Sequence, residues 1–165
     1  MTTPSENPLI DLGKKAPAFA LKNQEGTLCR LSQYAGQWVI LYFYPKDNTS
    51  SCTKQACAFR DQLPDFSSAN AVVLGVSPDD EKSHTKFIQK HDLPFTLLAD
   101  PEHQALTRYG VWQEKSMYGR KYMGVVRTTY LIDPKGKVAQ RWDKVKVANH
   151  IQDVLESLTR LQQEG

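Results

Sequence analysis

The stretch WVILYFYPKDNTSSC, residues 38–52, decides the fold of this chain. Its first part, Trp38–Tyr44, is a continuous run of β-branched and aromatic residues, which is typical of a strand buried on both faces. Its second part, Pro45–Ser51, is rich in residues that favour turns. The stretch therefore predicts a buried strand, a short loop and then a helix that begins near Cys52.

The predicted helix runs from Cys52 to about Leu63, with apolar residues on one side at Ala56, Phe59 and Leu63. Thr49 or Ser51 can cap its first turn, because a side-chain oxygen there accepts a backbone N–H. Pro64 lacks an N–H, so we expect it to break or kink the helix, or to open a second turn.

The residues that follow extend this pattern into an α/β fold. Ala71–Ser77 is a second buried strand, and strand, helix, strand at this spacing predicts a parallel βαβ unit. The expected later elements are a helix over 80–91, a strand over 95–99, a short helix over 104–109, a hairpin of 125–132 and 138–142, and a last helix after Asn149. This order favours a thioredoxin-like fold, with a central mixed β-sheet flanked by helices.

Length and composition indicate a single domain over residues 1–165, with residues 1–12 as a loose lead-in. The formal net charge is +3, and basic and acidic residues are interleaved, so we expect no nucleic-acid partner. No run approaches the roughly 20 apolar residues of a membrane span. The N-terminus also lacks the apolar core of a secretory signal, so we expect no membrane partner and a cytoplasmic location.

The chain has three cysteines, Cys29, Cys52 and Cys57, which is not the count of a disulfide scaffold. Cys52 lies where a buried strand gives way to a helix. A helix N-terminus carries about half a positive charge and unpaired N–H groups, and both favour a thiolate. A cysteine there can also be a plain buried residue. A hydroxyl at Thr49 in the same turn and a second thiol at Cys57 favour the reactive interpretation.

The C-x4-C spacing of Cys52 and Cys57 leaves two alternatives. Zinc sites use cysteine pairs, but they need four ligands, and the histidines at 84, 91, 103 and 150 form no matched pair. Dithiol oxidoreductases use C-x-x-C at such a turn, so here the position fits and the spacing does not. Cys29 has no partner in sequence and is interpreted as a strand residue without a catalytic role.

At these residues the sequence resembles a known family. Pro45-x-x-x-Thr49-x-x-Cys52 matches the active-site motif of the peroxiredoxins. Gln55-Ala56-Cys57 and the stretches 109–124 and 126–133 are similar to the bacterioferritin comigratory protein branch, also called the Q type. The resemblance runs from about Gly13 to Leu158. It departs at Ser50–Ser51, where the branch usually has Pro-Gly.

The resemblance implies a thioredoxin-like fold and a thiol-dependent reduction of hydrogen peroxide and organic hydroperoxides. It implies that Cys52 is the peroxidatic cysteine and Cys57 the resolving cysteine, and that Thr49 and Arg127 activate Cys52 while Pro45 shields it. It also implies thioredoxin as the reductant and a monomer, and it implies no metal, flavin or haem. The alternatives are a redox sensor and a thiol-disulfide oxidoreductase that use the same two cysteines.

Overall fold

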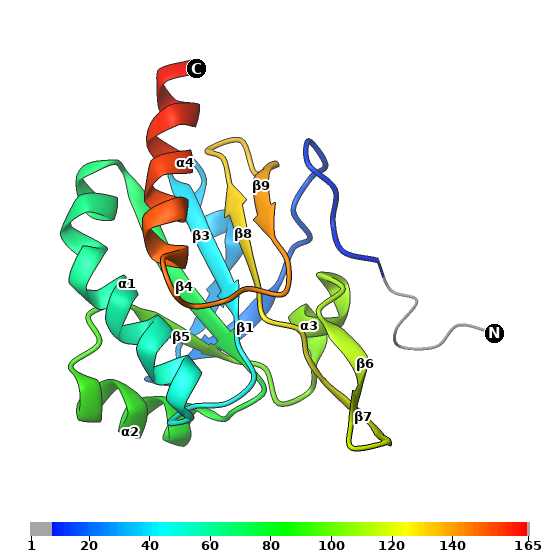
Figure 1. Ribbon diagram of the computed structural model, residues 1–165. Helices are drawn as coiled ribbons and strands as arrows, with labels where there is room; N and C mark the ends of the chain where they lie inside the picture. Colours follow the sequence, from blue (N-terminus) through cyan, green and yellow to red (C-terminus); the bar gives the residue numbers. More distant parts are fainter. Residues whose placement is uncertain (1–7, 165) are drawn as a thin grey trace.

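The computed structural model describes residues 8–164, which form one mixed sheet, a separate hairpin and four α-helices (Figure 1). The strands of the main sheet are β1 (Ala20–Asn23), β2 (Leu28–Arg30), β3 (Trp38–Phe43), β4 (Ala71–Ser77), β5 (Thr96–Ala99), β8 (Thr128–Ile132) and β9 (Val138–Trp142). The hairpin consists of β6 (Trp112–Met117) and β7 (Arg120–Val125). The helices are α1 (Ser50–Ser68), α2 (Glu81–His91), α3 (Gln104–Arg108) and α4 (His150–Glu164), and a 3₁₀ turn, η2, spans Leu31–Tyr34.

The main sheet has the order β2-β1-β5-β4-β3-β8-β9, with β3, β4 and β5 parallel and the outer strands antiparallel to their neighbours. Strand β3 lies between β4 and β8, and the side chains along it alternate between two buried faces. Val39, Leu41 and Phe43 enter one core cluster, while Ile40 and Tyr42 enter the other. This is why the run of apolar residues over β3 is continuous.

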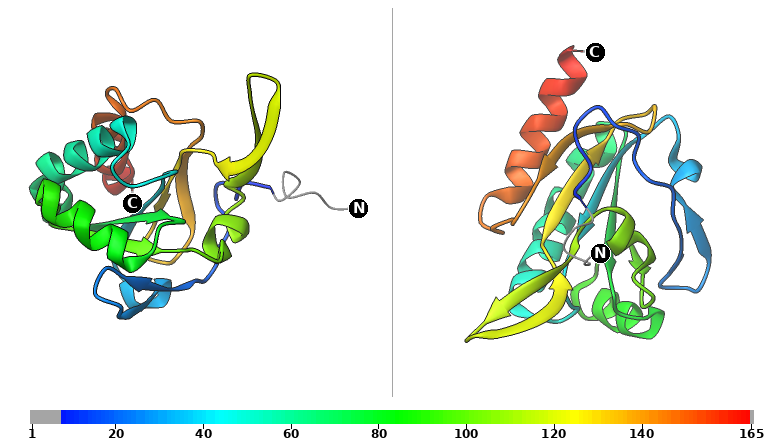
Figure 2. Two further views of the ribbon diagram at one scale, coloured as in Figure 1. Left: turned by 90° about the horizontal axis from the view of Figure 1, so that it is seen from below. Right: turned by 90° about the vertical axis from the view of Figure 1, so that its right-hand side faces the viewer.

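The helices are divided between the two faces of the sheet (Figure 1). Helices α1, α2 and α4 cover the face of Ile40 and Tyr42, where they contribute Phe59, Phe87 and Val154 to the core. Helix α3 and the segment before β1 lie on the opposite face, next to Val39 and Leu41. The hairpin β6–β7 projects from the body of the molecule (Figure 2).

The predicted α/β order is confirmed, including the parallel pairing of β3 with β4 and the hairpin of β8 with β9. Two expectations were wrong. Helix α1 does not end near Leu63 but continues through Pro64 to Ser68, because Phe66 beyond the proline is fully buried. Val125 belongs to β7 rather than to the strand that ends at Ile132.

The lead-in expected over residues 1–12 falls partly outside the described residues, which begin at residue 8. Within the described part, Leu9 and Ile10 pack against the core. The backbone of Ile10 accepts from Arg141 Nη1 at 2.7 Å and donates to Tyr130 Oη at 3.0 Å. In the part of the chain that the structure describes, no helix is both long and apolar enough to cross a membrane.

Candidate active site

The predicted site residues gather at one edge of the main sheet. The parallel strands β3, β4 and β5 all end at this edge, so the loop that follows each of them lies there. Strand β8 runs antiparallel to β3 with Thr128 opposite Phe43, so β8 begins where β3 ends. Arg127, directly before β8, is thereby brought close to the loop after β3 although 75 residues separate it from Cys52.

Cys52 lies in the first turn of α1, where the helix meets the sheet. The first backbone bond of the helix runs from Thr53 N to Thr49 O at 2.9 Å, so the N–H groups of Ser51 and Cys52 precede the helical bonding pattern. The side chain of Cys52 is 1% exposed and packs in the same core cluster as Tyr42 and Phe59. The thiol is therefore held between the positive end of a helix and an apolar core.

Arg127 makes a direct contact with the thiol. Its Nη2 lies 3.2 Å from Cys52 Sγ, and its Nη1 donates to Gln55 Oε1 at 2.6 Å. The backbone is fixed as well, because Arg127 O accepts from Val145 N at 2.9 Å. A guanidinium is always charged in proteins, so Arg127 places a fixed positive charge against the Cys52 sulfur.

Gln55 was not among the predicted site residues. It lies three residues after Cys52 on α1, and residues at this spacing share one face of a helix. Its side chain is fully buried, and its Nε2 has no hydrogen-bond partner in the structure. Gln55 therefore orients Arg127 through its oxygen and keeps a free donor beside the thiol.

Thr49 is the residue before α1, but its hydroxyl does not cap the helix. Thr49 Oγ1 donates to Lys46 O at 2.8 Å, which commits the hydroxyl hydrogen. The oxygen can then only accept a hydrogen bond from a bound molecule. The exposed Thr49 and the half-buried Pro45 both lie on the short loop that connects β3 to α1.

A second cation comes from the hairpin. Lys115 Nζ donates to Val125 O at 2.7 Å, two residues before Arg127. The Lys115 side chain packs against Gly124. A methyl group added at this glycine would lie 3.0 Å from Lys115 Cδ. Burial lowers the pKa of Lys115, the charge of Arg127 lowers it further, and Cys52 acts in the opposite direction. Nothing in the sequence pattern pointed to this lysine.

The other two cysteines differ in position. Cys57 is half-buried on α1, whereas Cys29 is buried in β2, and all three cysteines are free thiols. Among residues 8–164, one group of side chains has the spacing of metal ligands, Asp47, Asp79 and His84, and it contains no cysteine. The zinc alternative for Cys52 and Cys57 therefore has no further ligands within the described residues.

Comparisons with known proteins agree with this geometry. Residues 12–141 match the AhpC/TSA family. The chain is 46% identical to peroxiredoxin Bcp of Bacillus subtilis over 149 residues, which are 90% of this chain and 95% of the relative.

Two solved structures are also similar. A cysteine-to-serine variant of Xylella fastidiosa PrxQ has a TM-score of 0.89 at 35% identity, over 94% of this chain and 99% of that one. The bacterioferritin comigratory protein of Xanthomonas campestris, studied for its alkyl peroxide reduction in trapped intermediate and ligand complexes, has a TM-score of 0.86 at 40% identity, over 91% and 98%. The fold is therefore thioredoxin-like, and the chain belongs to the AhpC/TSA family as a peroxiredoxin, a thiol-dependent peroxidase similar to the Bcp and PrxQ proteins.

Proposed function

We propose that this protein reduces hydrogen peroxide and organic hydroperoxides with Cys52 as the nucleophile. The observation that carries the proposal is the 3.2 Å contact of Arg127 Nη2 with Cys52 Sγ in the first turn of α1. Organic hydroperoxides are included because the Xanthomonas campestris relative was studied for alkyl peroxide reduction.

Formation of a thiolate does not by itself account for a peroxidase. A thiol of ordinary pKa, ~8.5, is about 3% ionised at pH 7, so complete ionisation gains roughly 30-fold, or about 2 kcal/mol. A thiolate of lower pKa is also a weaker nucleophile. The remaining acceleration must come from groups that stabilise the transition state.

In the proposed reaction the Cys52 thiolate attacks one peroxide oxygen. A sulfur–oxygen bond forms, the oxygen–oxygen bond breaks, and the departing alkoxide or hydroxide takes up a proton. Arg127 and the free N–H of Cys52 face the developing negative charge as donors. Thr49 Oγ1, whose hydrogen is committed to Lys46 O, accepts from the peroxide O–H and orients it. We assign to Pro45 the shielding of the thiol from water.

The product is a sulfenic acid on Cys52, which Cys57 resolves. The Cys57 thiol attacks the Cys52 sulfur, a disulfide forms and water leaves, which prevents further oxidation. We propose that thioredoxin then reduces the disulfide by exchange. We also propose that the protein is a single-domain monomer of the cytoplasm.

A redox sensor and a thiol-disulfide oxidoreductase are the competing functions. A sensor is oxidised once and then changes partners, whereas a peroxidase consumes peroxide repeatedly while reductant is supplied. A dithiol oxidoreductase reduces insulin disulfides without peroxide.

The test is consumption of hydrogen peroxide in the presence of thioredoxin and its reductase, by the wild type and by Cys52→Ser. We expect sustained turnover by the wild type and none by the variant, because a serine hydroxyl is scarcely ionised. Cys29→Ser is the matched control, a buried thiol with no catalytic contact, and should turn over normally. A Cys52→Ser variant with even a tenth of the activity would disprove the assignment.

A further inference from the structure

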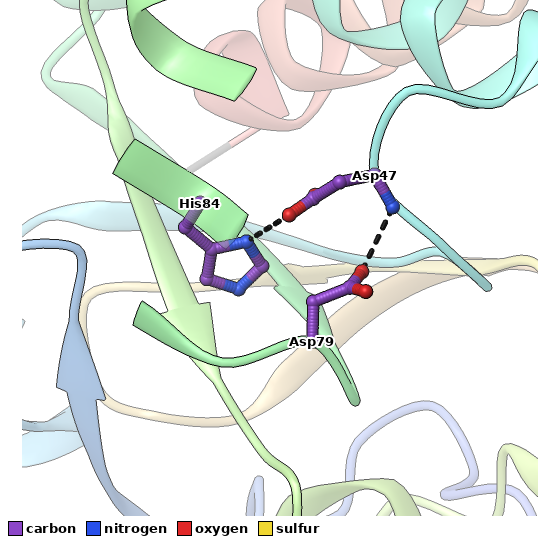
Figure 3. A group of neighbouring side chains, drawn as sticks. All are labelled: Asp47, Asp79 and His84. Carbon is purple, nitrogen blue, oxygen red and sulfur yellow. Dashed lines mark hydrogen bonds and ion pairs between the residues drawn. The ribbon is translucent and has the colours of Figure 1, made fainter. Parts of the chain in front are cut away.

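Asp47, on the loop between β3 and α1, forms a buried pair with His84 (Figure 3). His84 Nδ1 lies 2.7 Å from Asp47 Oδ2, and the side chains are 0% and 2% exposed. The other ring nitrogen, Nε2, lies 2.9 Å from Leu98 O at the end of β5. Asp47 belongs to the loop after β3 and His84 to α2, so the pair ties the loop to a helix and a strand.

The hydrogen bonds hold the Asp47 side chain in one place. A carbonyl oxygen only accepts, so Nε2 of His84 carries a hydrogen for Leu98 O. Asp47 accepts from Tyr44 Oη at 2.6 Å on one oxygen and from Ser83 Oγ at 2.7 Å on the other, where it also contacts His84 Nδ1. Three side chains therefore fix Asp47, and the pair that it forms with His84 is buried away from water.

The neighbouring groups agree with this arrangement. Burial, followed by the charges of Tyr42 and Asp47, raises the pKa of Tyr44 well above its usual value, so Tyr44 remains a donor to Asp47. The third member of the group, Asp79, accepts from Asp47 N at 2.8 Å and from Ser77 Oγ at 2.7 Å. Both oxygens of Asp47, both ring nitrogens of His84 and one oxygen of Asp79 thus already have protein partners.

This pair is connected to the active site through one peptide unit. The N–H of Asp47 is held by Asp79, and the C=O on the other side of the same peptide, that of Lys46, accepts the Thr49 hydroxyl at 2.8 Å. Lys46 and Thr49 are exposed, and Asp47 is the buried anchor of the loop. The position of Asp47 therefore determines where Thr49 Oγ1 points.

We propose that His84 is a positioning residue for peroxide reduction. It holds Asp47, and through Asp47 the Thr49 hydroxyl. This role rests on the proposed function, and the test separates the two, because loss of activity in Cys52→Ser does not depend on His84.

The test compares His84→Gln, Asp47→Asn and the double variant in the full chain. Two quantities are measured: the rate of a single turnover with hydrogen peroxide, and the free energy of unfolding in urea. His84→Gln and Asp47→Asn each loosen the loop that positions the Thr49 hydroxyl, so each should slow the single turnover on the order of tenfold. The double variant should be no slower than either single variant, because both changes act through the same hydroxyl.

Phe66→Leu is the control for a loss of stability alone. Phe66 is fully buried near the far end of α1, so this variant should unfold more easily while its single-turnover rate stays unchanged. If His84→Gln lowers stability like Phe66→Leu but leaves the single-turnover rate at the wild-type value, His84 is only structural and the proposal is wrong. If His84→Gln does not fold, Asp47→Asn decides. It should slow the turnover, and an unchanged turnover would overturn the proposal.

Discussion

Two polar clusters flank the loop between β3 and α1, and they differ in how completely their hydrogen bonds are formed. In the thiol cluster (Cys52, Gln55 and Arg127), Gln55 Nε2 has no partner. In the histidine cluster (Asp47, Asp79 and His84), side-chain oxygens and both ring nitrogens are bonded. An unpaired buried donor costs about 1–3 kcal/mol, so a protein retains one where a bound molecule can use it. The difference indicates that the thiol cluster receives a substrate and the histidine cluster holds the loop.

The largest expected effect comes from the groups that face the peroxide. Thr49→Val and Arg127→Ala should each slow the peroxide step by roughly 10²-fold, the usual cost of removing one group that stabilises a developing charge. Thr49→Ser should be much milder, because it keeps the hydroxyl. The measurement is the single-turnover rate of Cys52 oxidation at several peroxide concentrations. Full reactivity in Thr49→Val would mean that the Thr49 hydroxyl only shapes the loop.

The sequence predicted part of the thiol cluster and none of the histidine cluster, for a physical reason. Cys52 and Thr49 lie within one short motif, and Gln55 could have been inferred from its helical spacing to Cys52. Asp47 and His84 are 37 residues apart, and they meet only because parallel strands end at a common edge. Arg127 was assigned through the family resemblance, since its own segment gives no sign of contact with Cys52.

The fold shows the same difference between the parts that the sequence predicted and the parts that it did not. The buried strands were predicted because apolar residues are continuous along them. The hairpin β6–β7 was missed because it is largely exposed and polar, with Tyr118 98% exposed at its turn. Lys115, which reaches the active site from this hairpin, was missed with it.

A smaller effect is expected from the second buried histidine, which has no carboxylate partner. His150 is buried with its Nε2 2.8 Å from Thr129 Oγ1, and burial lowers its pKa from 6.5 to about 4. The unfolded chain therefore binds a proton between pH 6.5 and pH 4 that the folded chain does not. This contribution to stability is complete above pH 6.5 and is lost as the pH falls toward 4, by about 2 kcal/mol at pH 5.

Urea unfolding at pH 7 and pH 5 measures this loss, and His150→Gln should reduce it. If His150→Gln loses as much stability on acidification as the wild type, the charge state of His150 does not control acid unfolding.

The two clusters should also respond differently to oxidation. Cys52 and Cys57 are five residues apart on α1, so their Cα atoms are about 8.7 Å apart in an ideal helix. A disulfide rarely spans more than ~6.8 Å, so the first turns must unwind before the bond can close. We expect amide exchange over 53–57 to become roughly tenfold faster or more in the oxidised form, whereas amides around His84 keep their protection.

Hydrogen exchange in the two redox states, with the Cys52–Cys57 disulfide confirmed by mass spectrometry, makes this comparison. Equal protection of 53–57 in both states would show that the bond forms without unwinding. Loss of protection around His84 would show that the histidine cluster opens together with the helix and does not anchor the loop.

The smallest expected effect concerns Ser51, one of the two residues at which the active-site motif departs from its resemblance to the Q-type branch. Ser51 lies in the first turn of α1 and is not among the described residues with positive φ, so its backbone does not require glycine. Ser51→Gly should therefore only loosen the turn, by up to about 1 kcal/mol, which raises the unwound fraction up to about fivefold. Closure of the disulfide should accelerate by up to that factor, because unwinding precedes it, while oxidation of Cys52 by peroxide should be nearly unchanged, because it uses the folded turn. Stopped-flow fluorescence can separate the two steps in a single trace. If Ser51→Gly slowed peroxide oxidation instead and left disulfide closure unaffected, Ser51 would belong to the substrate site. The segment that unwinds on oxidation would then begin after Cys52.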